Sequence, residues 1–226
     1  MPLEIAVDNL AEAVIAAQHA DRLELCAELD RHGMTPSVEL VSSVVAAVTI
    51  PAFALVRESD SYVADHPTLD ALIESARRVV AAGATGIVIG VLTRRGEIDT
   101  PACREIINVA RTANPSIVVA FHRAFDDAGD TRAAIDALAA LGVSHTLSAG
   151  APGLDHSARS MADRLASLAR ARDLAAPQVG IVACGGVRSS NALEFAIASG
   201  GWVHSSCRVH GRFDVSQVRE LARLIR

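Results

Sequence analysis

Short apolar runs alternate with stretches of helical periodicity along the whole chain, and this alternation constrains the fold more than any other feature. The apolar runs predict eight strands: Leu3–Val7, Arg22–Ala27, Ala52–Arg57, Gly86–Leu92, Ser116–His122, His145–Gly150, Gln178–Gly185 and Trp202–Ser206. The intervening stretches predict eight helices: Leu10–Ala20, Pro36–Ala47, Leu69–Ala82, Pro101–Ala113, Thr131–Leu141, Ala158–Arg172, Asn191–Ser199 and Ser216–Leu224. Eight strand–helix units in 226 residues predict an α/β protein with a (β/α)8 TIM barrel, formed as a single domain over residues 1–226.

The alternative fold is an open, doubly wound sheet. Such a sheet would need fewer strands and a glycine-rich dinucleotide loop after the first strand. The sequence at that place is Val7-Asp8-Asn9-Leu10, which contains no glycine. The barrel is therefore favoured, and no nicotinamide or flavin site is indicated.

Local signals mark where several of the helices begin and end. A side-chain cap is expected at four helix starts, at Thr35, Thr68, Thr100 and Asp130. A glycine in the left-handed conformation is expected after three helices, at Gly83, Gly142 and Gly200.

The chain contains no lysine, so all 21 basic residues are arginines. A Schiff-base aldolase or a pyridoxal phosphate enzyme needs a lysine amine to form its imine, so both classes are excluded. Arginine binds carboxylates and phosphates well but cannot act as a base. A compositional bias toward arginine would explain the absence, but the chemical consequence is the same.

Charge and cysteine usage limit the partners and the compartment. The net charge is −5 without a basic block, which argues against nucleic acid. No apolar run approaches the roughly 18 residues of a membrane span, and the N-terminus does not resemble a signal peptide. The four cysteines show no CxxC spacing, so we expect a cytoplasmic protein with reduced thiols. The sequence does not decide whether the protein forms a homodimer.

The strand pattern predicts an unusually polar barrel interior. In the second predicted strand, Leu23 and Leu25 share one face and should meet the helices, so Glu24 and Cys26 should point inward. The same rule turns Ile87, Ile89, Val119 and Phe121 toward the helices, and it turns inward Glu4, Ala6, His122, Thr146, Ser148, His204 and Ser206. Most barrels fill this space with branched apolar side chains. The polar lining therefore indicates a ligand site, although a structural ion-pair cluster would explain part of it.

The segment Phe121–Asp126 places three polar residues at the end of a predicted strand. His122, Arg123 and Asp126 would lie at the edge where α/β folds carry their chemistry. A structural network, with Arg123 paired to Asp126 and His122 bonded to a backbone carbonyl, is the alternative interpretation.

Several segments, taken in this order, resemble the CutC family, which is named for copper homeostasis. They are Ala20–Cys26, Gly33–Ser37, Ile50-Pro51 with Arg57, Gly90–Leu92 with Gly96 and Ile98-Asp99, Phe121–Asp126, Leu147 with Ser148 and Gly150, Gly185-Gly186 and His204–Ser206. The resemblance runs from Leu3 to about His210 and implies a TIM barrel, as does the strand count. It also implies cytoplasmic copper handling, with Cu(I) bound by cysteine.

For copper, the resemblance implies a ligand set centred on Cys26. Soft Cu(I) prefers thiolate and thioether ligands, but the family's first-strand cysteine is replaced by Ala6 in this chain. Possible substitutes are Cys184, Cys207 and Met34, whereas Cys103 lies in a helix and is not expected to bind. Alternatively, Cys26 is only a small buried residue.

The second hypothesis is a TIM-barrel enzyme or binding protein for a small anionic metabolite, without a role in copper. Glu24 and His122 would exchange protons with the ligand. The expected binding residues are Arg57, Arg123, Ser148, Gly185, Gly186, His204 and Ser206. Hard-oxygen metals fit poorly, because Glu4 and Glu24 are the only clustered acidic residues. The sequence does not decide between catalysis and binding.

Overall fold

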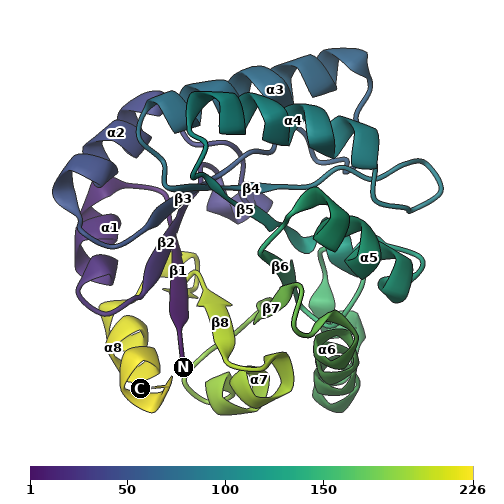
Figure 1. Cartoon of the computed structure of the whole chain (residues 1–226). Coiled ribbons are helices and arrows are strands. Elements are labelled where there is room, and N and C mark those ends of the chain that lie inside the picture. The colour runs from purple at the N-terminus through teal and green to yellow at the C-terminus, as the bar shows by residue number, and fades with distance from the viewer. Residues whose placement is uncertain (226) are drawn as a thin grey trace.

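The computed structural model describes residues 1–225, which form a closed barrel of eight parallel strands surrounded by helices (Figure 1). The strands are β1 (Leu3–Val7), β2 (Arg22–Leu25), β3 (Ala52–Leu55), β4 (Gly86–Ile89), β5 (Val118–Phe121), β6 (His145–Ser148), β7 (Gly180–Ala183) and β8 (Trp202–Ser205). The helices are α1 (Leu10–Ala17), α2 (Val38–Ala47), α3 (His66–Ala81), α4 (Thr100–Ala113), α5 (Thr131–Leu141), α6 (Met161–Ala175), α7 (Ala192–Ser199) and α8 (Val215–Ile225). The prediction of a TIM barrel is confirmed.

Smaller elements lie in the loops that follow the strands. They are the 3₁₀ helices η1 (Leu29–Arg31), η2 (Arg123–Asp127) and η3 (His156–Ala158), and a short hairpin of β9 (Arg208–Val209) and β10 (Arg212–Phe213). All but the first strand end one to three residues before the predicted limit. The residues beyond these ends, such as Cys26, Arg57 and His122, leave the sheet ladder and line the mouth of the barrel.

Three of the four predicted N-caps are wrong, and Asp130 is confirmed. The caps are Ser37, Asp65 and Asp99 instead of Thr35, Thr68 and Thr100. Thr35 has another role: its hydroxyl accepts the Arg57 N–H at 2.9 Å and donates to the Glu58 carboxylate at 2.6 Å. Gly142 and Gly200 end their helices with positive φ as predicted, and Gly83 has φ +102° one residue after the C-cap of α3.

The apolar residues form two layers separated by the sheet. The outer layer lies between strands and helices and contains the six residues predicted there, Leu23, Leu25, Ile87, Ile89, Val119 and Phe121. The inner layer fills the barrel with Ala6, Cys26, Phe53, Leu55, Val88, Ala120, Leu147, Ala149, Val182 and Cys184. Alternation along each strand therefore predicts the two layers correctly in most strands.

Strand β6 is the exception. Leu147 belongs to the inner layer, so Thr146 and Ser148 face away from the barrel axis and the predicted inward direction is wrong. Both side chains are buried all the same, and the Ser148 hydroxyl donates to Asp126 at 2.5 Å. Their small hydroxyls pack between sheet and helices, whereas Leu147 fills the interior.

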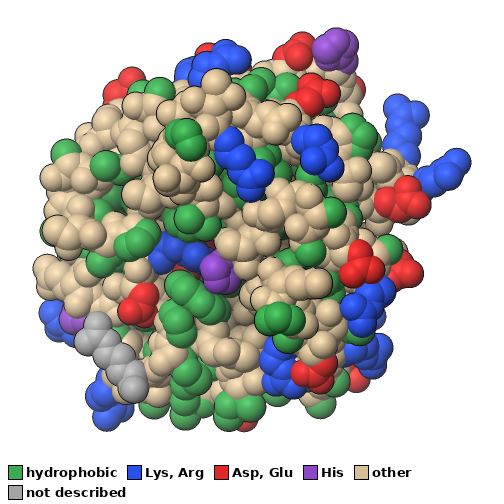
Figure 2. All heavy atoms as spheres, viewed as in Figure 1, with side chains coloured by type: hydrophobic (Ala, Val, Ile, Leu, Met, Phe, Trp, Pro, Cys, Tyr) green, Lys and Arg blue, Asp and Glu red, His purple; other side chains and the backbone are tan. Residues whose placement is uncertain are grey.

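Met1 and Ile225, the first and last described residues, meet beside the seam between β1 and β8. Strand β1 pairs with β8, and the amino group of Met1 donates to the carbonyl of Ile225 in α8 (Figure 1). Acidic and basic side chains are interspersed around the edge of the face shown in Figure 2. Within residues 1–225 no helix has the length and apolarity needed to cross a membrane.

Candidate functional site at the mouth of the barrel

A cavity of about 360 Å³ opens at the C-terminal ends of the strands, and we call it the mouth cavity. Its lining includes nearly all of the predicted site residues: Glu24, Cys26, Arg57, His122, Arg123, Gly185, Gly186, His204 and Ser206. Further residues complete it: Ala6, Leu29, His32, Leu55, Tyr62, Leu147, Leu154, His156, Cys184, Arg188 and Ser205. The structure thus brings residues from the ends of seven strands, all but β4, to one place, as expected for a barrel.

Ser148 is the one predicted binding residue that lies outside the mouth cavity. It lines a separate surface groove between the loops after β5 and β6. Its hydroxyl and the Ala149 N–H both donate to the carboxylate of Asp126, at 2.5 Å and 2.8 Å. Arg123 Nε lies 3.6 Å from the same carboxylate. Ser148 therefore supports the loop that carries Arg123 and is not placed to contact a ligand in the mouth cavity.

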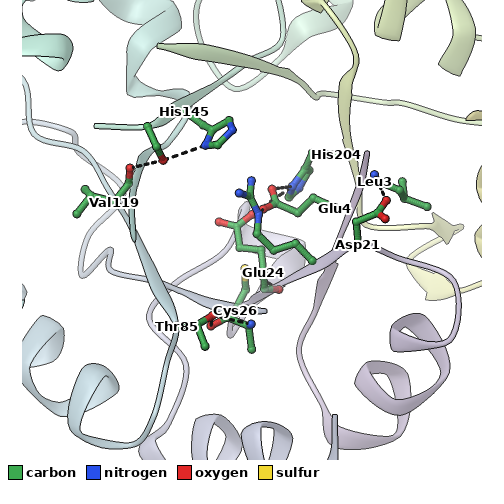
Figure 3. Close-up of polar contacts among 12 residues, drawn as sticks. Leu3, Glu4, Asp21, Glu24, Cys26, Thr85, Val119, His145 and His204 are labelled. Atoms are coloured by element: carbon green, nitrogen blue, oxygen red, sulfur yellow. Dashed lines mark hydrogen bonds and ion pairs between the residues drawn. The ribbon is translucent and has the colours of Figure 1, made fainter. Parts of the chain in front are cut away.

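The base of the mouth cavity is a buried ionic network (Figure 3). His204 Nδ1 is 2.7 Å from Glu4 Oε1 and 3.3 Å from Glu24 Oε2. Arg22 donates through Nε to the other oxygen of Glu4. Glu4 is fully buried below the cavity, whereas Glu24 and His204 reach its lining. The pairings follow from register, because Glu4 lies beside Arg22 on β2 and beside His204 on β8.

This network separates the proton affinities of the two carboxyl groups. Burial alone would raise the pKa of Glu4, but Arg22 and His204 outweigh it and lower that pKa to about 2. Burial raises the pKa of Glu24 to about 7, and the neighbouring Glu4 charge acts in the same direction. Burial opposes the charge on His204, yet its two carboxylate partners raise its pKa. Two carboxyls with such different pKa values are typical of sites that transfer protons.

Arg22 was not identified from the sequence, although it lies two residues before Glu24 on the same face of β2. Its guanidinium carbon is 4.2 Å from the ring centroid of Phe53 and 4.4 Å from that of Trp202. Sandwiched between these rings and paired with Glu4, it supports the base of the site from below. The period-two rule that places Glu24 inside would have placed Arg22 there as well.

The imidazole of His122 is oriented by the backbone two residues further along the chain. Its Nδ1 accepts the N–H of Ala124 at 3.1 Å, which caps η2. Burial, aided by the charge of Arg57, lowers the pKa of His122 to about 3. The ring is therefore neutral at pH 7, with its proton on Nε2, and it offers a hydrogen-bond donor. This arrangement differs from the predicted bond to a backbone carbonyl.

The guanidiniums of Arg57 and Arg123 are held mainly by backbone carbonyls. Arg57 donates to Gly33 at 2.8 Å, and Arg123 donates to Gly153 at 2.7 Å. The nearest carboxylate oxygens are more distant, at 3.8 Å for Arg57 and 3.6 Å for Arg123. In residues 1–225, the buried Nε atoms of both arginines have no hydrogen-bond acceptor. Arg123 and Asp126 thus form the long ion pair of the structural alternative, and two guanidiniums whose carboxylate partners lie beyond hydrogen-bond distance make this side of the mouth cavity cationic.

The turn after β7 provides a close backbone approach. Gly185 and Gly186 both have positive φ, at +76° and +81°. A Cβ at Gly186 would lie 2.8 Å from Nε2 of His156, and one at Gly185 would lie 2.7 Å from the Cβ of Ala149. Glycine is therefore required at both positions. His156 itself was missed, because it comes from a loop without periodicity.

The cysteines divide between the two layers of the core. Cys26 and Cys184 line the mouth cavity, whereas Cys103 and Cys207 pack in the outer layer. Burial, with the nearby Glu24 carboxylate, raises the pKa of the Cys26 thiol, and burial raises that of Cys184 as well. Of the three substitutes expected from the sequence, Cys184 lines the mouth cavity, whereas Cys207 and Met34 do not.

Comparison with known proteins identifies the relatives of this chain. The model of the CutC family matches residues 1–209. A family protein CutC from Enterobacter sp. (strain 638) is 34% identical over 220 residues, covering 96% of this chain and 83% of the relative. The human copper homeostasis protein cutC homolog is 32% identical over 181 residues, covering 79% and 65%. The structure of a CutC protein from Streptococcus agalactiae has a TM-score of 0.79 at 24% identity, covering 91% of this chain and 99% of that one. These matches show that the chain belongs to the CutC family.

Proposed function

We propose that the mouth cavity binds a small organic anion, a carboxylate or a phosphate. The observation that carries this proposal is the state of Arg57 and Arg123. Both are held in place by backbone carbonyls, both line the cavity, and neither has a carboxylate oxygen closer than 3.6 Å. An anion would provide charge-assisted hydrogen bonds, each worth about 1.5–3 kcal/mol.

Neighbouring groups suit the same ligand. Arg188 and His204 add positive charge to the lining. The glycine turn at Gly185-Gly186 allows backbone N–H groups to approach an anion closely. The neutral His122 would donate a hydrogen bond through Nε2, and Glu24, whose pKa is near 7, would exchange a proton with the bound molecule. In this proposal His122 is a donor rather than the base.

The test is a thermal-shift screen of small phosphates and carboxylates in the presence of EDTA. Wild type is compared with Arg123→Ala and with Arg77→Ala, which removes an exposed arginine and so controls for net charge. A ligand at 100 times its Kd stabilises the folded state by about 2.7 kcal/mol. We expect this gain in wild type and Arg77→Ala, and most of it should be lost in Arg123→Ala.

Two outcomes would contradict the proposal. Either no anion stabilises wild type, or the same anions stabilise Arg123→Ala equally well. In both cases the polar side chains that line the mouth cavity form a structural network and not an anion site.

The second candidate function is Cu(I) binding in the cytoplasm, in keeping with the names of the relatives. One structural feature favours it: Cys26 and Cys184 both line the mouth cavity. Two observations weigh against tight binding. The family's first-strand cysteine is replaced by Ala6, and both thiols have raised pKa values, which disfavours the thiolate that Cu(I) needs. We therefore rank it second.

A further inference from the structure

The base of the mouth cavity also contains a group of side chains that could hold a metal ion. Glu4, Glu24 and His204 each offer one atom, two carboxylate oxygens and one imidazole nitrogen, and these atoms lie within 4.8 Å of one another. Among the described residues, this is the one group of three or more His, Cys, Asp or Glu side chains with such an arrangement. We propose that these three residues bind a divalent transition-metal cation.

One of the distances between these atoms already equals the spacing of ligands around an ion, and a second is shorter. Zn²⁺ binds imidazole nitrogen and carboxylate oxygen at about 2.0–2.2 Å, which places neighbouring ligand atoms of a tetrahedron roughly 3.3–3.5 Å apart. His204 Nδ1 and Glu24 Oε2 are 3.3 Å apart. His204 Nδ1 and Glu4 Oε1 are closer, at 2.7 Å, because a proton joins them. A cation would replace this proton, and the pair would have to separate by less than 1 Å.

Glu24 itself is incompletely paired. Its side chain is 5% exposed, and within residues 1–225 its one ionic partner is His204. It also lines the mouth cavity. A buried carboxylate needs more compensation than one charged neighbour at 3.3 Å. A bound cation would provide that compensation, as a proton does in the metal-free protein.

The surroundings of the three ligands orient them. Arg22 holds one oxygen of Glu4 and leaves Oε1 facing His204. Arg22 is itself fixed between the rings of Phe53 and Trp202. Outer partners of this kind set the direction of metal-ligating carboxylates. One nitrogen and two oxygens suit Zn²⁺, Mn²⁺ or Fe²⁺, whereas Cu(I) would prefer sulfur.

Three protein ligands leave coordination positions open, as in catalytic rather than structural metal sites. The open side would face the mouth cavity, since Glu24 and His204 line it. The proposal goes beyond anion binding and does not rest on it. A cation requires ionised Glu24, so the proton-bearing and cation-bound forms of this residue are alternative states of the same site.

The experiment is a titration of ZnCl₂ into the metal-free full-length protein, followed by calorimetry with no organic anion present. Wild type is compared with Glu24→Gln, which keeps the shape of the side chain. The control is His66→Ala, because His66 and Asp70 form an exposed pair with 3.5 Å between Nδ1 and Oδ2 that would bind Zn²⁺ adventitiously. We expect one tight equivalent in wild type and in His66→Ala, and binding to Glu24→Gln weaker by at least about tenfold.

A second measurement does not depend on a folded variant. Co²⁺ added to wild type should give the intense visible bands of a low-coordinate ion, and Zn²⁺ should abolish them. Wild type without saturable Zn²⁺ binding, Co²⁺ with the spectrum of the hydrated ion, or Glu24→Gln that binds as tightly as wild type would each overturn the proposal. Because the anion screen contains EDTA and this titration contains no organic anion, the two proposals fail or succeed separately.

Discussion

The imidazole ring of His122 lies directly against the backbone of Gly90. A Cβ at residue 90 would be 2.2 Å from Cε1 of that ring. Gly90 follows β4 and His122 follows β5, so the two residues lie side by side where the neighbouring strands end. Gly90 therefore provides the space in which His122 keeps its orientation toward the mouth cavity.

Replacing this glycine should move the imidazole. We expect Gly90→Ala to destabilise the protein by about 1–3 kcal/mol, which is typical of overpacking a buried site. Urea unfolding measures the loss. Gly129→Ala is the matched control, because its Cβ would meet only a carbonyl oxygen at 4.0 Å. Equal stability of Gly90→Ala and Gly129→Ala would show that the His122 ring can move aside without a loss of folding stability.

Arg22 neutralises a carboxylate that has no access to water. Glu4 is 0% exposed and Arg22 4% exposed. Arg22→Met should cost about 3–5 kcal/mol, because it leaves a buried charge with only His204 as partner. The double variant Arg22→Met/Glu4→Gln should recover part of this loss, since no charge is then stranded. Urea unfolding of wild type, both single variants and the double variant completes the cycle. If the loss of unfolding free energy in the double variant equals the sum of the losses in the two single variants, Arg22 and Glu4 are not energetically coupled.

The fold could be predicted because eight repeats of one simple pattern admit few architectures. The inward positions of Glu24, His122 and His204 also follow from strand alternation and from the end of an apolar run. The same reasoning gives the wrong direction for Ser148, because its small hydroxyl can be buried outside the barrel, where Asp126 accepts its hydrogen bond. Polarity alone therefore does not distinguish the inner face of a strand from a buried outer face.

The rest of the site lies beyond what periodicity can reveal. Tyr62 and His156 come from loops, whose path depends on tertiary contacts. The guanidiniums of Arg57 and Arg123 are positioned by backbone carbonyls that lie 24 and 30 residues away in the chain, at Gly33 and Gly153. The contrast between Glu4 and Glu24 depends on which carboxylate Arg22 reaches. Each of these is a property of the closed barrel and not of any local segment.

Glu24 should make folding stability depend on pH in a particular direction. Its pKa is about 7 in the folded protein and 4.5 as an ordinary value, so between these two values the folded state binds the additional proton. Its contribution to stability is therefore fully present below pH 4.5 and is lost as pH rises toward 7. His122, with a pKa lowered from 6.5 to about 3, acts in the opposite direction over pH 3–6.5 and partly masks the effect.

The variant Glu24→Gln removes the contribution of Glu24, together with its effect on the pKa of His204, and leaves that of His122, which is common to both proteins. Relative to wild type, the variant should gain stability as pH rises from 4.5 to 7, by at most about 1.4 kcal/mol per pH unit. Urea unfolding at several pH values measures the difference. Parallel curves for the two proteins would mean that Glu24 is already ionised at pH 4.5 to 7.

Binding of Cu(I), if it occurs, should depend on the position of the cysteines and not on their number. If Cu(I) binds, Cys26→Ser should abolish stoichiometric binding, because Cys26 lies in the lining of the mouth cavity. Cys103→Ser should leave binding intact, because that thiol is buried in the outer core and lies 3.9 Å from the carbonyl oxygen of Val91. The measurement is competition with a chromogenic Cu(I) chelator under anaerobic, reducing conditions.

We expect weak binding even in wild type. This chain has Ala6 where the resemblance to the family implies a first-strand cysteine, and burial, with the Glu24 carboxylate nearby, raises the pKa of the Cys26 thiol. A single thiolate competes poorly with the thiols of a cell for Cu(I), which prefers two or more soft ligands. Equal Cu(I) binding by wild type and Cys26→Ser would remove Cys26 from the ligand set. If Cys103→Ser also binds equally, neither of these two thiols holds the ion, and Cys184 is the remaining thiol in the lining of the mouth cavity.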